Sequence, residues 1–191
     1  MARPRSFDGD EVLDKAGEVF RSKGFDGTSI EDLEKAVGLR RASLYGAYGD
    51  KRALYLAALK RYQGTRGVRL LEELNAAKTG RAAIERLLYI TADEASADTA
   101  GCLLANAASE RSAHDGGVAR CVEDNRRRME GALLAAVLRG QADGSVKIRG
   151  EARTTARFLI AATLGIRALA RTGCGKAELK AVAEQAMTVL G

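Results

Sequence analysis

The residues best equipped for chemistry stand close together between positions 40 and 51. Arg40, Arg41, Ser43 and Tyr45 carry positive charge or hydroxyl groups, and Lys51 follows them. Arginine can donate paired hydrogen bonds to the edge of a guanine, and basic or hydroxyl side chains also bind phosphate oxygens. This combination predicts contact with nucleic acid rather than the making or breaking of covalent bonds.

The rest of the chain offers little to a catalytic or metal site. Its single histidine, His114, stands beside Asp115 next to two glycines. One histidine is too few for a histidine-based metal site, and the sequence shows no arrangement typical of a catalytic triad. Residues 173–176, GCGK, lack the earlier glycine and the following Ser or Thr of a phosphate-binding loop. We therefore expect no enzyme activity, no cofactor and no metal ion.

A helix-turn-helix would present the basic side chains on one outward face. Thr28 and Ser29 can cap a helix that begins near residue 30, with acidic residues in its first turn where the helix dipole favours them. Gly38 then allows the chain to turn. The second helix is predicted over about Arg40–Gly46, and its N-terminal end is the one that enters a groove in such motifs.

The expected DNA contacts divide by role. Arg40, Arg41 and Ser43 lie at the N-terminal end of the second helix and are expected to read base edges. Tyr45 and Lys51 are expected to position the helix on the phosphate backbone. Arg3 and Arg5 belong to an N-terminal arm that could reach a groove. The remaining expected contacts are Thr28, Ser29 and Tyr48.

Residues 12–62 resemble the DNA-binding domain of the tetracycline-repressor (TetR/AcrR) family. The matching positions are Ala16 and Phe20, Gly24-Phe25, Thr28-Ser29, Gly38, Leu44-Tyr45, Tyr48 and Asp50-Lys51. The family often has His-Phe where this chain has Ala47-Tyr48, and Ile-Ala where it has Leu33-Glu34. The absent histidine removes a possible phosphate contact. The resemblance implies a regulator that binds double-stranded operator DNA.

The composition predicts an all-α fold. Alanine, leucine and arginine are the commonest of the 191 residues, tryptophan is absent, and the single proline lies at position 4. With the resemblance, this predicts a three-helix DNA-binding domain over residues 1–50 and a larger helical effector-binding and dimerisation domain over 51–191. Outside the helix-turn-helix, helices are expected over about 8–23, 50–74, 81–96, 101–109, 118–138, 151–172 and 176–190.

Composition also bears on location. No stretch approaches the roughly 18 apolar residues that a membrane-spanning helix needs, and the N-terminus has no apolar signal core. Three cysteines, an odd number at wide spacings, suit a reducing compartment better than a disulfide framework. We therefore expect a cytoplasmic protein without a membrane partner.

The apolar residues of the two C-terminal helices cover a wider surface than a helix needs to pack against a single core. Such surfaces can pack inside one chain or between two chains. The resemblance favours a homodimer, because TetR-like proteins pair through their last two long helices into a four-helix bundle, and a palindromic operator requires two-fold symmetry. The expected interface consists of Phe158, Ala162, Gly165, Ile166, Leu169, Val182, Ala186 and Val189.

The resemblance also implies a small-molecule effector that shifts the protein away from its DNA-binding arrangement. The second domain is rich in leucine, so a small apolar molecule is expected to be the inducer. The candidate pocket residues are Leu70, Leu74, Leu88, Cys102, Leu103, Met129, Leu133 and Phe158.

Two alternatives stay open. Residues 101–110, GCLLANAASE, resemble a motif of one TetR subgroup in which a cysteine can sense electrophiles or oxidants, so Cys102 is either a sensor or a buried structural residue. A helical dimeric scaffold without DNA binding would also explain the apolar helices. It would not explain why basic and hydroxyl groups gather on one short helix and its exit.

Overall fold

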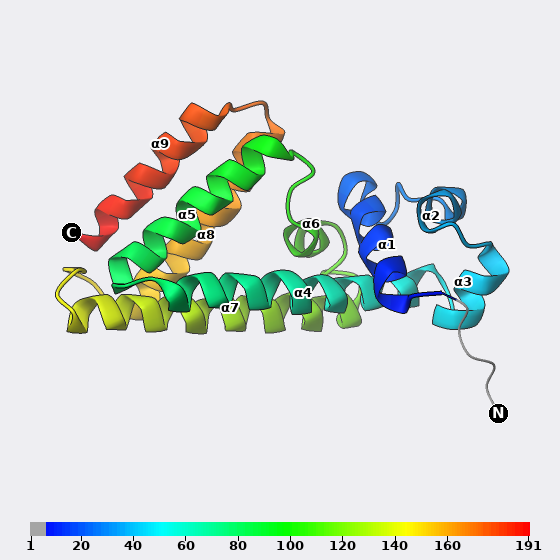
Figure 1. The fold of residues 1–191 in the computed structure, drawn as a ribbon, viewed down its shortest axis with the longest axis horizontal. Helices are drawn as coiled ribbons and strands as arrows, with labels where there is room; N and C mark the ends of the chain where they lie inside the picture. Colours follow the sequence, from blue (N-terminus) through cyan, green and yellow to red (C-terminus); the bar gives the residue numbers. More distant parts are fainter. Residues whose placement is uncertain (1–6) are drawn as a thin grey trace. The chain divides into compact units, whose positions relative to one another are not determined.

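The computed structural model describes residues 7–191, so the expected DNA contacts Arg3 and Arg5 lie outside the described residues. Within residues 7–191 the chain is built from helices and contains no strand (Figure 1). This confirms the predicted all-α fold. The helices are α1 (Gly9–Lys23), α2 (Ile30–Val37), α3 (Arg41–Tyr48), α4 (Lys51–Ala76), α5 (Gly80–Ala97), α6 (Leu103–Glu110), α7 (Gly116–Ala142), α8 (Ala152–Arg171) and α9 (Lys176–Met187), followed by a 3₁₀ turn over Thr188–Leu190.

Local capping explains where the first helices begin and end. The Asp8 carboxylate accepts the Asp10 N–H at 2.9 Å and so caps α1. Ser29 and Asp32 form a reciprocal capping box at the start of α2. Gly38 ends α2 with φ of 73°, a left-handed conformation that favours glycine.

The two longest helices extend beyond their predicted ends. α4 continues to Ala76, beyond the predicted end at residue 74, and α7 begins at Gly116 and ends at Ala142, beyond the predicted bounds of 118–138. The cause in α7 is Asp115, whose carboxylate accepts the N–H groups of Gly117 and Val118 at 2.8 and 3.2 Å. A carboxylate cap therefore outweighs the two glycines that follow it.

The described chain packs as two compact units that differ from the expected division at residue 50. Unit 1 contains the chain up to residue 66 together with residues 102–123, and unit 2 contains residues 67–101 and 124–191. The first part of α4 belongs with α1–α3 because Leu54, Tyr55 and Leu59 share their buried core. Residues of α6, including Leu103, are buried in that same core.

Ion pairs fix the helices of unit 1. The Arg52 guanidinium at the start of α4 donates to both carboxylate oxygens of Asp115 at 2.6 and 2.8 Å, and holds the pKa of that carboxyl well below its usual range. Arg61 on α4 reaches Asp10 and Asp14 on α1 at 2.7 and 2.9 Å. These pairs join α4 to α7 and to α1.

In unit 2, α5 packs against α8 and α9, which also pack against each other (Figure 1). A charged cluster ties α7 to α8. The buried Glu130 carboxylate lies 2.7 Å from Arg126, 2.9 Å from Arg153 and 3.2 Å from Arg157. Hydrogen bonds from Arg157 and then Arg153 lower the pKa of Glu130 to about 2. No helix in the described chain has the length and apolar character needed to cross a membrane.

Candidate nucleic-acid interface

The predicted recognition helix corresponds to α3, which presents its polar side chains outward. Arg40 is its N-cap residue, and Arg40, Arg41 and Ser43 are all exposed. Leu44 is fully buried and fixes the opposite face of α3 in the core of unit 1. The structure therefore brings the three expected base-reading residues together on one solvent-facing surface.

The N-terminus of α3 is capped from the preceding helix. Arg40 makes no side-chain cap, but the Arg41 backbone N–H donates to Glu34 Oε1 at 2.7 Å. A carboxylate at a helix N-terminus satisfies a free N–H and complements the helix dipole. Sequence reasoning noted Glu34 only as a departure from the family pattern. The sequence did contain a signal for this contact. The helix that follows Glu34 has no capping side chain at Arg40, so its N-terminus needs an acceptor from elsewhere.

Tyr45 supports Arg41 from within the same helix. The Arg41 guanidinium carbon lies 5.3 Å from the centroid of the Tyr45 ring, one helical turn further on. A guanidinium over an aromatic face is held in a restricted set of orientations by cation–π attraction. Tyr45 itself is half-buried against the core of unit 1. The tyrosine can therefore orient the arginine that is expected to read bases.

Two of the expected DNA contacts use their hydroxyl groups inside the protein. Tyr48 donates to the Gly9 carbonyl at 3.1 Å and so attaches the end of α3 to the start of α1. Thr28 is 2% exposed, and its hydroxyl donates to the Gly24 carbonyl at 2.6 Å. These side chains therefore stabilise the helix-turn-helix itself.

Ser29 and Lys51 lie at the starts of the helices on either side of α3. Ser29 is exposed and caps α2, while a hydrogen bond from Lys23 and then one from Ser29 lower the pKa of Asp32 to about 2. The Lys51 ammonium lies 4.6 Å from the centroid of the Phe25 ring. Both residues are thus anchored next to helix N-termini, where free N–H groups suit an anion.

The expected effector residues fall into both units. Leu74, Leu88 and Leu133 are buried in the core of unit 2, and Leu103 is buried in the core of unit 1. Cys102 is half-buried at the start of α6. Met129 is half-buried on α7, Phe158 is 46% exposed on α8, and the Leu70 side chain is outside the described part of the structure.

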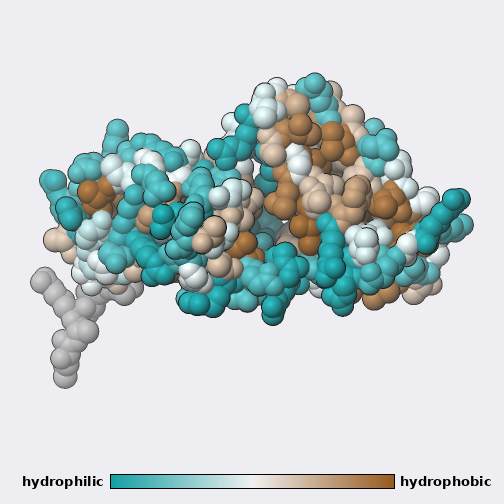
Figure 2. Space-filling model, turned by 180° about the vertical axis from the view of Figure 1, so that it is seen from behind, coloured by the Kyte–Doolittle hydropathy of each residue, from teal (hydrophilic) through white to brown (hydrophobic). Residues whose placement is uncertain are grey.

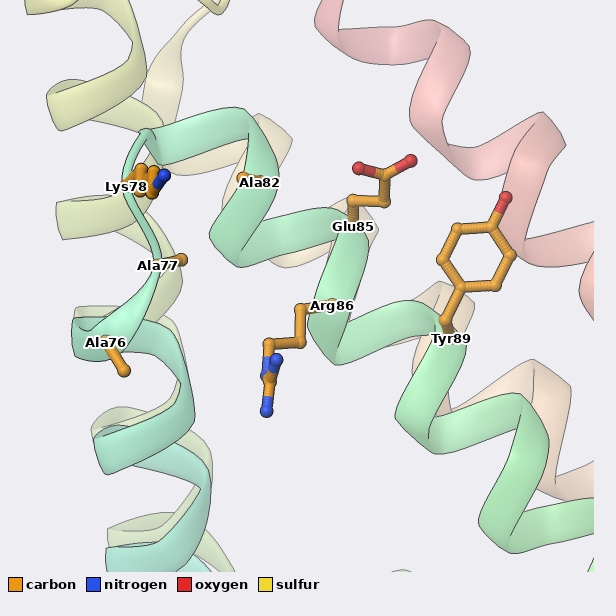
Figure 3. Close-up of a pocket in the computed structure, with 7 residues that line it drawn as sticks. All are labelled: Ala76, Ala77, Lys78, Ala82, Glu85, Arg86 and Tyr89. Atoms are coloured by element: carbon orange, nitrogen blue, oxygen red, sulfur yellow. The ribbon is translucent and has the colours of Figure 1, made fainter.

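A pocket of about 540 Å³ lies elsewhere in unit 2 (Figure 3). It is formed by the end of α4 and the first half of α5, and none of the expected effector residues lines it. Glu85 and Tyr89 point toward α9, whereas Arg86 points toward the end of α4. Tyr89 donates to Glu184 at 3.3 Å and Arg86 pairs with Glu73, so these polar groups are engaged within the protein.

The expected dimer residues divide by exposure. Phe158 and Leu169 are exposed on α8, and Leu164, which was not among the expected residues, is 46% exposed between them. Ala162, Gly165, Val182 and Val189 are half-buried, whereas Ile166 and Ala186 belong to the core of unit 2. Seen from behind, unit 2 shows apolar side chains gathered among hydrophilic ones (Figure 2).

Comparison with known proteins identifies the family. Residues 12–58 match the model of the bacterial regulatory proteins of the tetR family. Over the full length of both chains, the protein is 31% identical to the uncharacterized HTH-type transcriptional regulator YezE of Bacillus subtilis. It is 28% identical to the HTH-type transcriptional repressor ComR of Escherichia coli, over 95% of this chain and 88% of that protein.

A solved structure shares the whole fold. The TetR family transcriptional regulator CifR, as a cysteine mutant complexed with 26bp double-strand operator DNA, is 29% identical and superposes with a TM-score of 0.87 over 100% of both chains. The chain therefore belongs to the tetR family of bacterial regulatory proteins, and it is a DNA-binding transcriptional regulator.

The cap on α3 makes a first prediction. We expect Glu34→Ala to destabilise the protein by about 0.5–2 kcal/mol, because the Arg41 N–H loses its carboxylate acceptor. Glu34→Gln keeps an accepting oxygen at the same reach and should lose less. Urea unfolding of the three proteins measures the difference. Equal free energies of unfolding for wild type and Glu34→Ala would show that this contact does not stabilise the protein.

Proposed function

We propose that the protein is a repressor that binds operator DNA as a homodimer and leaves it when a small, largely apolar molecule binds. The helix-turn-helix lies within residues 1–50, and the effector site and the dimer interface are proposed to lie within residues 51–191. The observation that carries this proposal is the outward presentation of Arg40, Arg41 and Ser43 on a helix anchored by Glu34, Leu44 and Tyr48. The similarity to the repressor ComR along most of its length supports repression rather than activation.

DNA recognition is proposed to separate base reading from phosphate binding. Arg41 is exposed and supported by the Tyr45 ring, so its two N–H groups can meet the O6 and N7 acceptors of a guanine. Lys51 lies at the start of α4, where it can approach a phosphate without reaching a base. Ser29, exposed at the start of α2, is the second proposed phosphate contact.

A homodimer is supported by the apolar face of α8. Phe158, Leu164 and Leu169 are each more than one third exposed although they are large apolar residues, with values of 46%, 46% and 37%. Gly165 lies within the same stretch, and a Cβ added there would meet nothing within 4 Å in the subunit. A second copy of α8 can therefore approach closely and cover this face.

An effector with a polar group is supported by Gln63. This α4 residue is only 9% exposed, and within residues 7–191 its Nε2 finds no hydrogen-bond partner. The Cys121 thiol lies 3.9 Å from its Oε1. An unsatisfied buried amide costs free energy, which an accepting oxygen on a bound molecule would recover. The proposed effector is therefore apolar over most of its surface and carries such an oxygen.

A base-reading arginine makes a testable prediction. Arg41→Ala should weaken binding to a duplex selected from a random pool by about 1–3 kcal/mol more than binding to unselected DNA, because the guanine contact is lost. Lys51→Ala is the matched control. It should weaken both equally and flatten the slope of log affinity against log salt by about 0.9. An unchanged specificity ratio in Arg41→Ala would assign base reading to other residues.

The dimer interface makes the next prediction. Gly165→Leu should fit the isolated subunit but place two bulky side chains at the two-fold contact, at a cost of about 1–3 kcal/mol for each. We expect a helical monomer that no longer binds the selected duplex, as measured by sedimentation and circular dichroism. Gly131→Leu, at an equally open position on α7, should remain dimeric. A dimeric Gly165→Leu that binds DNA would place the interface elsewhere.

The thiol-sensor alternative rests on Cys102. This residue is the N-cap of α6 and is half-buried. Under the effector proposal, Cys102→Ser should respond to the inducer as wild type does, and dilution should restore DNA binding. Release by an electrophile that survives dilution, is reversed by a thiol reductant and is lost in Cys102→Ser would instead establish thiol chemistry.

A further inference from the structure

α6 ends against the turn that connects α1 to α2. The Phe25 backbone N–H donates to Glu110 Oε2 at 3.2 Å. Gly24 has φ of 74°, and a Cβ added there would lie 2.8 and 2.9 Å from the two carboxylate oxygens. The positive φ favours glycine here, and the missing Cβ leaves room for the carboxylate close to the backbone. The turn is therefore shaped to receive the Glu110 carboxylate.

A second contact from α6 holds the end of α1. The Asn106 Nδ2 donates to the Arg21 carbonyl at 3.1 Å, in the last turn of α1 where carbonyls lack helical partners. Asn106 and Glu110 are four residues apart and so lie on the same face of α6. Ala107 between them is fully buried in the core of unit 1. One face of α6 thus forms hydrogen bonds with both the C-terminal end of α1 and the start of the turn.

The residue after α6 adds a third contact. The Arg111 guanidinium lies 4.6 Å from the Phe25 ring centroid and 3.6 Å from the Asp26 carboxylate. Lys51, the proposed phosphate contact, lies 4.6 Å from the same ring. Phe25 is therefore held at its N–H by Glu110 and at its ring by two cations.

The turn leads directly into the helices proposed to meet DNA. Its Gly24 carbonyl accepts the Thr28 hydroxyl at 2.6 Å, immediately before Ser29 caps α2. α2 in turn supplies the Glu34 carboxylate that caps α3. These hydrogen bonds follow one another along residues 24–41, all within unit 1, so the turn that Glu110 contacts leads directly into the caps of α2 and α3.

We infer that Glu110 is a positioning residue for DNA recognition, which fixes the α1–α2 turn and through it the placement of Ser29, α3 and Lys51. This inference rests on the proposed DNA-binding function.

The test compares carboxylate removals that change the net charge equally. Glu110→Ala, Glu110→Gln and Glu72→Ala each remove one negative charge, and Glu72 is an exposed residue of α4 far along the chain. Charge alone would raise DNA affinity in all three. The inference predicts the opposite for Glu110→Ala, about a tenfold loss of affinity for the selected duplex, the size expected for a hydrogen bond to a charged group. Glu110→Gln, which keeps an accepting oxygen, should bind nearly as wild type does.

Amide hydrogen exchange gives a readout that needs no DNA. In Glu110→Ala the Phe25 amide should exchange at least about tenfold faster than in wild type, while the Leu33 and Leu44 amides keep their protection. Unchanged Phe25 exchange, or an affinity of Glu110→Ala that matches Glu72→Ala, overturns the inference. If wild type binds no DNA, the proposed function fails, whereas the exchange result still decides whether Glu110 holds the turn.

Discussion

The proposed recognition helix cannot hold its own position, and unit 1 is organised around that constraint. α3 is only eight residues long and has no side-chain cap at Arg40. An isolated helix of this length is unstable in water because too few hydrogen bonds repay its nucleation. Its geometry therefore comes from its neighbours: Glu34 at one end, Tyr48 at the other, and Leu44 in the core between them. Base reading needs arginines at fixed positions, so recognition depends on these three contacts.

The same constraint explains why unit 1 includes α6 and the start of α7 in addition to α1–α3. A head made of α1–α3 alone would leave the α1–α2 turn and the start of α4 poorly fixed. Glu110 on α6 holds the turn, and Asp115 before α7 holds Arg52 in the first turn of α4. Many acids of α1 and α2 serve in such pairs, as Asp10 and Asp14 do with Arg61. Arg40 and Arg41, in contrast, remain exposed to solvent.

The sequence predicted features that depend on residues close in the chain. The start of α2 at Ser29 and the turn at Gly38 follow from local capping and backbone preference, and both are confirmed. The partners of Thr28 and Tyr48 could not be predicted, because a hydroxyl that binds DNA and one that binds a distant carbonyl look alike in the sequence. On α8, helical spacing alone could not separate the exposed Phe158 from the buried Ile166, since both are apolar and the packing of α5 and α9 decides the face.

We propose that α3 reads guanines in the major groove of operator DNA. Methylation interference on a duplex selected from a random pool tests it most directly, because methylation of guanine N7 blocks the major-groove acceptor that an arginine needs, whereas methylation of adenine N3 alters only the minor groove. We expect interference by guanine N7 methylation at two symmetry-related positions, because a dimer presents two copies of α3. Interference confined to adenine N3, or none at any guanine, would contradict it.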